Sequence, residues 1–594
     1  MNKGGRRRAS APVLPAPGSL VVRVVPDVAG LDKEFDYLVP DAPAASVREG
    51  SVVRVDLAGR RVGGWVVAVG VEPPAGRPLL EVAKVTGWGP EPELLDLAGW
   101  AAWRWAGRRR SLLATASPAG AVPLLPVRAL HRPAAPPVAS LLADLPSDRP
   151  LLLRLPPASD VTTVVAEMAQ RGPTLVVVPS HARASVLAAR LRAAGGDVAL
   201  MPGDWAQARA GAAVVAGARA AVWAPCPGLA GIVVVDGHDE NLAQEQAPTW
   251  HAVTVAAERA RRAGVPCVVT SPCPTLDLLR SGPLRVVSRS VERAGWAALQ
   301  VVDRRLDDPR LGLYSERLVA LVRSERRVLC VLNRTGRARL LACSACGTVA
   351  RCERCGAAVS QQPGAAAPRP LECPKCSLVR PQVCAACGST SLKALRVGVT
   401  KVREELEDLA RRAVGEVTAS TAETPDAPVL VGTEAVLHRA SRAGPPWAVA
   451  FLDFDQELLA PRVRAAEEAL ALLATASRLA GGRAGRVVVQ TRLPDHPVVR
   501  AALLADPGRI VVGEEEVRRA LRLPPFVSVA LLSGAGAAEY AGALGALPGS
   551  PVEVLGPAGG EWLVKAQSSD ALAGVLAAVP RPPGRLRVAV DPAL

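Results

Sequence analysis

Residues 343–356 read C-S-A-C-G-T-V-A-R-C-E-R-C-G, and residues 373–388 read C-P-K-C-S-L-V-R-P-Q-V-C-A-A-C-G. Together they hold four C-x-x-C pairs: Cys343/Cys346, Cys352/Cys355, Cys373/Cys376 and Cys384/Cys387. Two thiolates three residues apart on a tight turn can face one ion, so each pair supplies half of a tetrahedral four-thiolate site. Eight sulfurs therefore predict two metal sites. Regular pairs without ferredoxin spacing favour zinc over an iron–sulfur cluster.

Other readings of these cysteines are less consistent with the rest of the chain. All six histidines lie outside the window, so mixed Cys/His sites are not expected. A disulfide framework needs an oxidising compartment. The basic start of the chain runs into Pro-rich sequence without an apolar segment, so we interpret residues 1–19 as a disordered basic tail and expect a cytoplasmic protein. Four pairs can be grouped in three ways, and spacing alone does not choose among them.

Length and charge limit the class of protein. The 594 residues are enough for several domains, and no run of 18 apolar residues predicts a membrane span. The net charge of +16 and the pI near 9.8 suit a polyanionic partner such as nucleic acid. The alternative is a compositional bias, because only seven of the 71 basic residues are lysines.

The first quarter of the chain predicts small modules. Residues 20–88 hold short runs of alternating apolar and polar residues, separated by glycine and proline, which indicate a β-domain. Residues 91–114 have a helical pattern, and we interpret residues 91–147 as a helical, winged-helix-like module followed by a linker.

The rest of the chain predicts an α/β protein with several domains. Continuous Val/Leu strands alternate with amphipathic helices over residues 148–300 and again over 301–507, which is typical of doubly wound parallel sheets. The cysteine-rich module, residues 340–395, is inserted in the second of these lobes. Residues 508–594 predict a small α/β C-terminal domain.

Six further motifs occur in a fixed order around the cysteines. They are K-E-F-D-Y-L-V-P (33–40), A-G-A-R-A-A-V-W-A-P (216–225), H-D-E-N-L-A-Q-E-Q-A-P-T-W-H-A (238–252), L-N-R-T-G-R-A (332–338), R-V-G-V-T-K-V-R-E-E-L (396–406) and V-V-V-Q-T-R-L-P-D-H-P (487–497). This set resembles the PriA family, the primosomal proteins N′ of bacterial replication restart, which are superfamily 2 helicases. The resemblance covers most of the chain and implies two RecA-like lobes.

The resemblance also implies particular sites. Two zinc ions are expected, one held by the outer pairs (Cys343, Cys346, Cys384, Cys387) and one by the inner pairs (Cys352, Cys355, Cys373, Cys376). Phe35, Asp36 and Tyr37 correspond to the family's pocket for a DNA 3′ end, in which an aromatic ring can stack on the terminal base and a carboxylate can accept from its hydroxyl. The alternative is that F-D-Y-L-V is only a half-buried strand. The basic residue of that pocket aligns with either Arg77 or Lys84.

The helicase chemistry of the family, in contrast, is not expected here. A P-loop ends in Gly-Lys-Ser/Thr, and none of the seven lysines follows a glycine. Where the family carries its P-loop, this chain reads R-L-P-P-A-S-D, and two prolines remove an amide donor and the freedom of an anion nest. Of the family's second helicase motif, Asp236 is present. Gly237 stands where the family has the carboxylate that orients the attacking water. The family's last helicase motif carries the arginine finger. In one alignment Arg478 retains one arginine of this motif, but Gly481 stands at the position of the finger. The alternative alignment places residues 482–486 in the motif.

These observations favour a replication restart protein that recognises abandoned forks or single-stranded DNA. We expect it to promote primosome assembly and reloading of the replicative helicase without helicase activity of its own. Whether ATP and Mg²⁺ bind without turnover is left open by the sequence. One alternative is an active ATP-dependent 3′-to-5′ helicase with divergent motifs. Another is a zinc-ribbon scaffold unrelated to DNA, which would show no preference for forks.

Overall fold

The computed structural model describes residues 12–592, except 17, 32, 41–46, 73–75, 129–130, 135–140, 306, 308–312, 333–340, 362–368, 395–398 and 441–445. Most of the predicted basic tail therefore lies outside the described residues, as do most of the motif at 332–338 and the start of the motif at 396–406. Within the described part of the chain, no helix is both long and apolar enough to cross a membrane.

The N-terminal domain is a five-stranded antiparallel sheet in the order β2-β1-β4-β3-β5, as predicted for a β-domain. Its strands are β1 (Val21–Pro26), β2 (Phe35–Leu38), β3 (Val52–Leu57), β4 (Arg60–Val69) and β5 (Val82–Gly87). Two helices follow, α2 (Pro92–Arg104) and α3 (Arg109–Ala116).

The helical pattern of residues 91–114 corresponds to two helices, because the chain turns at Ala106 and Gly107. Ala106 has a φ of 45°, and the N–H of Gly107 bonds to the carbonyl of Ala102, which ends α2. A Cβ at position 107 would lie 2.5 Å from Cβ of Pro248, so glycine allows this turn to approach the following domain. No further helix or strand is found in the described residues between α3 and β6, so only the helical part of the winged-helix prediction is present.

The first lobe, residues 151–295, is a seven-stranded parallel sheet in the order β12-β6-β11-β10-β7-β9-β8. Its strands are β6 (Leu151–Arg154), β7 (Thr174–Val177), β8 (Val198–Leu200), β9 (Val214–Gly217), β10 (Gly231–Val234), β11 (Cys267–Ser271) and β12 (Leu284–Val286). The connecting helices are α4 (Thr162–Ala169), α5 (His181–Ala193), α6 (Trp205–Ala210), η1 (Arg219–Trp223), η2 (Glu240–Leu242), α7 (Ala252–Ala263), α8 (Leu276–Ser281) and α9 (Arg289–Gly295).

Successive residues of each central strand enter different cores, as a sheet with two covered faces requires. Val233 packs with α4 and α5, whereas Ile232 and Val234 pack with α7. The latter core continues into α2 and the C-terminal domain, so one apolar cluster joins three parts of the chain.

The second lobe, residues 298–510, is a six-stranded parallel sheet in the order β13-β23-β22-β14-β21-β20. The strands are β13 (Ala298–Asp303), β14 (Val328–Val331), β20 (Val414–Val417), β21 (Val429–Gly432), β22 (Ala448–Phe451) and β23 (Arg486–Thr491). The helices are α10 (Glu316–Ser324), α11 (Val399–Ala410), α12 (Ala435–Arg439), α13 (Asp455–Leu458), α14 (Ala465–Leu479), η4 (Gly482–Ala484), α15 (Pro497–Leu503) and η5 (Pro507–Ile510).

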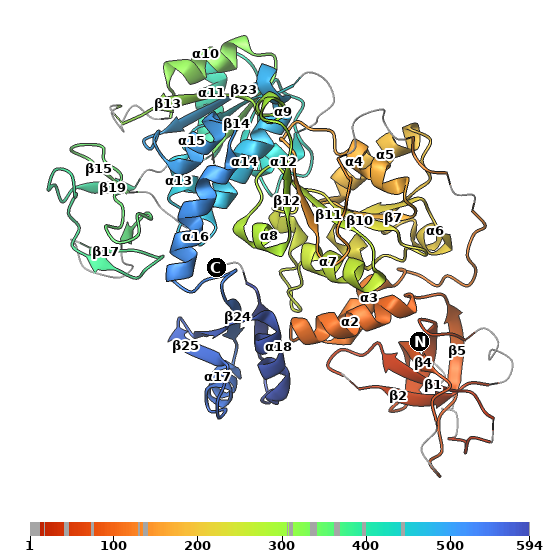
Figure 1. The fold of residues 1–594 in the computed structure, drawn as a ribbon. Helices are drawn as coiled ribbons and strands as arrows, with labels where there is room; N and C mark the ends of the chain where they lie inside the picture. The colour runs from red at the N-terminus through yellow and green to blue at the C-terminus, as the bar shows by residue number, and fades with distance from the viewer. Residues whose placement is uncertain are drawn as a thin grey trace, which may run out of the picture.

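The cysteine-rich module leaves the second lobe after β14. Because β13 also belongs to this sheet, the insertion follows the second strand of the lobe in chain order. It contains a two-stranded ribbon, β15 (Leu341–Cys343) with β19 (Leu392–Ala394), and a three-stranded sheet of β16 (Ser360–Gln361), β17 (Leu371–Glu372) and β18 (Val379–Arg380). Figure 1 shows the module projecting from the second lobe, near α16.

The chain ends in α16 (Val511–Ala520) and a small antiparallel sheet in the order β25-β26-β24-β27. This sheet consists of β24 (Ser528–Ser533), β25 (Val552–Ala558), β26 (Glu561–Ala566) and β27 (Arg587–Val590), with helices α17 (Ala537–Gly545) and α18 (Ser569–Ala578). Figure 1 shows α18 beside the end of α2, where Arg104 forms an ion pair of 2.8 Å with Asp591. The predicted fold class is confirmed.

Candidate functional site

All four C-x-x-C pairs adopt the same turn. The residue after the second cysteine donates its N–H to the carbonyl of the first cysteine at 2.8–2.9 Å and has a φ between 56° and 74°. These four residues are Gly347, Gly356, Ser377 and Gly388. The left-handed conformation favours glycine. Of these four residues, only Ser377 adopts it with a side chain. The repeated turn directs both thiols of each pair to the same side of the chain.

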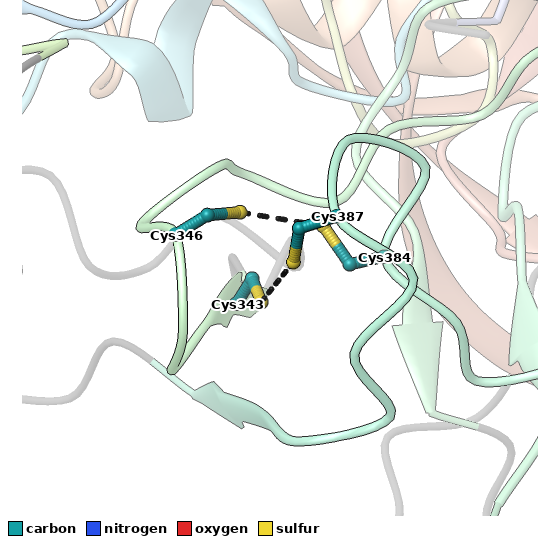
Figure 2. A group of neighbouring side chains, drawn as sticks. All are labelled: Cys343, Cys346, Cys384 and Cys387. Atoms are coloured by element: carbon teal, nitrogen blue, oxygen red, sulfur yellow. Dashed lines mark hydrogen bonds between the residues drawn. The ribbon is translucent and has the colours of Figure 1, made fainter.

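The thiols converge in two sets. One contains Cys343, Cys346, Cys384 and Cys387, and the sulfurs within it lie no more than 4.8 Å apart (Figure 2). In this set Cys343 is 3.6 Å from Cys387, and Cys346 is 3.6 Å from Cys384. A tetrahedral ion with Zn–S bonds of about 2.3 Å sets its ligands about 3.8 Å apart, so the geometry fits one ion.

The second set contains Cys352, Cys355, Cys373 and Cys376, again within 4.8 Å. The closest approaches are 3.4 Å, between Cys352 and Cys376 and between Cys355 and Cys373. These distances are far longer than the roughly 2.05 Å of a disulfide bond. Of the three groupings that spacing allows, the structure adopts the one that joins outer with outer and inner with inner pairs.

Strand pairing produces this grouping. The β15–β19 ribbon sets Cys343 opposite Leu392, which brings the last pair back to the first. In the inner set, β17 leads directly into Cys373. The cysteines are themselves much of the module's apolar core, with Leu341, Val359 and Leu371 among the few other buried residues. Such a small core depends on cross-links or metal for stability.

The surroundings of the thiols shift their pKa values in opposite directions. Hydrogen bonding to the hydroxyl and backbone N–H of Thr348 lowers the pKa of Cys346 to about 6. Burial, together with the neighbouring sulfur of Cys373, raises the pKa of Cys355 to about 12. Four thiolates so close together require a cation, and a divalent ion supplies that charge. Each four-cysteine cluster can hold a metal ion, consistent with zinc.

The segment after β6, where a P-loop is absent from the sequence, lies against the end of the first lobe. Pro156 and Pro157 have no N–H to donate. The N–H of Ala158 is already bonded to the carbonyl of Gly295 at 3.1 Å. Pro156 packs so closely on Gly295 that a Cβ there would lie 2.3 Å from it. Among the described residues of this segment, the N–H groups of Ala158 and Ser159 are both bonded to backbone carbonyls, so neither is free to contact a phosphate.

Asp236, which follows β10, is bound by arginines on two sides. Its side chain is 3% exposed. Arg478 of α14 donates from Nη1 and Nη2 to the two carboxylate oxygens, each at 2.7 Å, and from Nε to the carbonyl of Pro157 at 2.7 Å. Arg183 donates to the same carboxylate. Burial alone would raise the pKa of Asp236, but Arg183 and Arg478 outweigh it and hold that pKa well below its usual range.

Gly237 has no room for the missing carboxylate. A Cβ at this position would lie 2.3 Å from Cγ1 of Val269, which is a buried residue of β11. The carboxylate of Asp236 is thus engaged by two guanidinium groups, and an acidic side chain at position 237 would require the side chain of Val269 to move.

Phe35, Asp36 and Tyr37 lie on β2, and alternation separates them into two faces. Tyr37 is buried, and its hydroxyl donates to the carbonyl of Asp56 at 3.2 Å. Phe35 packs against the same core and is partly exposed. Asp36 lies on the opposite face, where Arg23 donates from Nε to it at 2.8 Å. Tyr37 therefore has no face open to a base, whereas Asp36 is 16% exposed and accepts from both Nε and Nη2 of Arg23.

A pocket that the sequence did not reveal lies between α3 and the first lobe. It has a volume of 560 Å³, and its polar and aromatic lining includes Ser111, His181, Arg219, Asn241, Gln244 and Trp250. Several of these residues follow β7, β9 and β10, at the carboxyl edge of the parallel sheet where α/β proteins bind ligands. The motifs at 216–225 and 238–252 supply part of this lining, but their convergence with α3 depends on the tertiary fold.

Comparison with known proteins identifies relatives. Residues 23–118 match the model of the PriA 3′ DNA-binding domain (3′BD), a range that includes α2 and α3. The replication restart protein PriA of Haemophilus influenzae is 28% identical over 357 residues, covering 55% of this chain and 48% of that protein. The probable replication restart protein PriA of Mycobacterium tuberculosis (strain CDC 1551) is 32% identical over 347 residues, covering 55% and 52%. The chain spans about half the length of the curated relatives it matches.

Among solved structures, S. cerevisiae Dbp5 bound to RNA and ADP BeF3 has a TM-score of 0.35 and 10% identity. The match covers 63% of this chain and 89% of that chain.

Proposed function

We propose that this chain, a relative of the replication restart protein PriA that carries a domain of the PriA 3′ DNA-binding type, binds abandoned replication forks and promotes primosome assembly without hydrolysing ATP. The match of residues 23–118 to the 3′ DNA-binding domain is the observation that carries the DNA-binding part. The bidentate contact of Arg478 with Asp236 supports the absence of hydrolysis, because that carboxylate is not available to a metal.

The charge of the protein supports a nucleic-acid partner. A net charge of +16 favours association with phosphate backbones. Such binding weakens as the salt concentration rises, because the release of counterions from the nucleic acid is then less favourable. The zinc module would then brace the second lobe and present basic side chains to fork DNA or to a primosome protein. Its exposed basic residues include Arg351, Arg354, Arg369 and Lys393. A scaffold unrelated to DNA would bind forks and random duplex equally, with little dependence on salt.

Asp36 is the proposed acceptor for the terminal 3′ hydroxyl. Asp36→Asn should weaken binding to a fork with a free 3′ end by about ten- to a hundredfold, because a hydrogen bond to a charged group contributes about 1.5–3 kcal/mol. The measurement is fluorescence anisotropy with forks that end in a 3′ hydroxyl or a 3′ phosphate. The wild-type protein should prefer the hydroxyl, since a phosphate would repel the carboxylate.

Tyr37→Phe is the matched control. It removes a buried hydroxyl bonded to Asp56 but leaves Asp36 in place, so the preference for the hydroxyl end should persist. Equal preference in wild-type protein and the Asp36→Asn variant would exclude Asp36 as the acceptor. Equal affinity of the wild-type protein for forks and blunt duplex would contradict fork recognition itself.

A further inference from the structure

The two parallel-sheet lobes are in direct contact at both ends of α14. At its C-terminal end, Arg478 reaches across to Asp236 and to the carbonyl of Pro157 in the first lobe. Just beyond it, a Cβ on Gly482 would lie 2.7 Å from the carbonyl of Ala294. The second lobe therefore touches the first at the two segments that align with the P-loop and the second helicase motif, where a motor protein would bind a nucleotide.

The N-terminal end of α14 makes a second contact. Glu467 accepts the N–H of Leu276, the first residue of α8 in the first lobe, at 2.7 Å. Arg464 pairs with Asp277 of the same helix at 2.9 Å. Glu467 and Arg478 are eleven residues apart, which separates the two contacts by about 16 Å along the helix. Two attachments at that distance oppose both sliding and rotation of one lobe against the other. Figure 1 shows the lobes side by side.

We propose that Arg478 acts as a built-in ligand that takes the place of nucleotide and holds the two lobes in one fixed arrangement. Its guanidinium makes three charge-assisted bonds to groups of the first lobe, two of them in the bidentate geometry that gives the strongest arginine–carboxylate pairs. In a motor protein the relative position of the lobes depends on the nucleotide, whereas here the cross-lobe contact belongs to the chain itself. This inference concerns the protein without DNA and is independent of fork binding.

The test is hydrogen–deuterium exchange of the full-length, zinc-loaded protein without DNA. In the wild-type protein, the segments 155–159, 235–242 and 476–486 should exchange slowly, and adding Mg²⁺ with ATP or with a non-hydrolysable analogue should change nothing. Arg478→Ala should speed exchange in these segments about a hundredfold or more, because it removes all three bonds from Arg478 to the first lobe. Asp236 then keeps only its contact with Arg183 of its own lobe, and the buried carbonyl of Pro157 loses its bond. Arg478→Lys cannot contact both carboxylate oxygens and the carbonyl of Pro157. Its exchange rates in these segments should lie between those of the wild-type protein and those of Arg478→Ala.

Two further variants make the outcome decisive. Asp236→Asn keeps the size of the side chain, so it serves if Arg478→Ala fails to fold, and it should also speed exchange in segment 476–486 of the partner lobe. Arg483→Ala removes an exposed arginine five residues from Arg478 and should match wild type. Exchange in Arg478→Ala or Asp236→Asn equal to that of Arg483→Ala would overturn the proposal. Protection of the wild-type segments by nucleotide would overturn it as well.

Discussion

Cys352→Ser is expected to reduce bound zinc from two ions per chain to about one, and to unfold the inner half of the cysteine-rich module. Structural zinc sites contribute apparent binding free energies of about 10–16 kcal/mol, so loss of one thiolate removes more stability than the module's small apolar core can replace. Cys343→Ser should have the same effect on the outer set. The measurement is the metal content of purified protein by mass spectrometry.

A cysteine that lies outside both four-cysteine sets provides the control. Cys267→Ser changes a buried thiol of β11 that belongs to neither set, and its zinc content should remain at two. If Cys352→Ser and Cys343→Ser also keep two ions, these residues are not ligands. If either releases both ions, the two sets do not bind independently.

Arg518→Met is expected to cost about 3–5 kcal/mol of stability. Arg518 lies on α16 and is 1% exposed, and its Nη2 is 2.6 Å from Glu467 and 3.2 Å from Glu514. Burial raises the pKa of Glu514, which shows how poorly solvated this site is. Without the guanidinium, Glu467, whose side chain is 7% exposed, loses this charged partner, and α16 loses this link to α14. Chemical denaturation measures the change.

Arg519→Met tests the same substitution on the same helix at an exposed position. Arg519 pairs with Glu515 at 2.6 Å, but its side chain is 62% exposed. Such a surface pair contributes no more than about 0.5 kcal/mol. A similar loss of stability in both variants would mean that the burial of Arg518 is not what matters.

The parallel sheets were predictable because their central strands are continuous Val/Leu runs, as a sheet covered on both faces requires. The peripheral strands were not. In β12, Leu284 and Val286 are exposed, and in β13 most residues are only partly buried, so neither has a strong apolar pattern. An edge strand is held in the sheet by its hydrogen bonds to one neighbouring strand. The sequence of the edge strand alone does not identify that neighbour.

The spacing of the cysteines predicts which residues are candidate metal ligands. It does not predict which two C-x-x-C pairs share one ion. The turn that aims two thiols at one ion is local, whereas the choice among three groupings depends on the pairing of β15 with β19, about 50 residues apart. The family resemblance, and not the spacing, implied the grouping that the structure adopts. The period of two on β2 puts Phe35 and Tyr37 on one face of the sheet. Which face is buried depends on the rest of the sheet, so the burial of Tyr37 could not be predicted from β2 alone.

The cross-lobe contact of Arg478 could not be predicted. Arg478 and Asp236 are separated by 242 residues, and only the packing of one lobe on the other brings them together. The sequence indicated that each is retained from a helicase motif, but not that they bind each other.

The central claim is that the chain binds forks without consuming ATP. The most direct test measures fork binding and ATP hydrolysis side by side on the same purified, zinc-loaded protein. We predict salt-sensitive binding that favours forks over blunt duplex and is unchanged by ATP, with hydrolysis at the level of a protein-free control. Fork-stimulated ATP turnover above that control would contradict the account and identify the chain as an active helicase with divergent motifs.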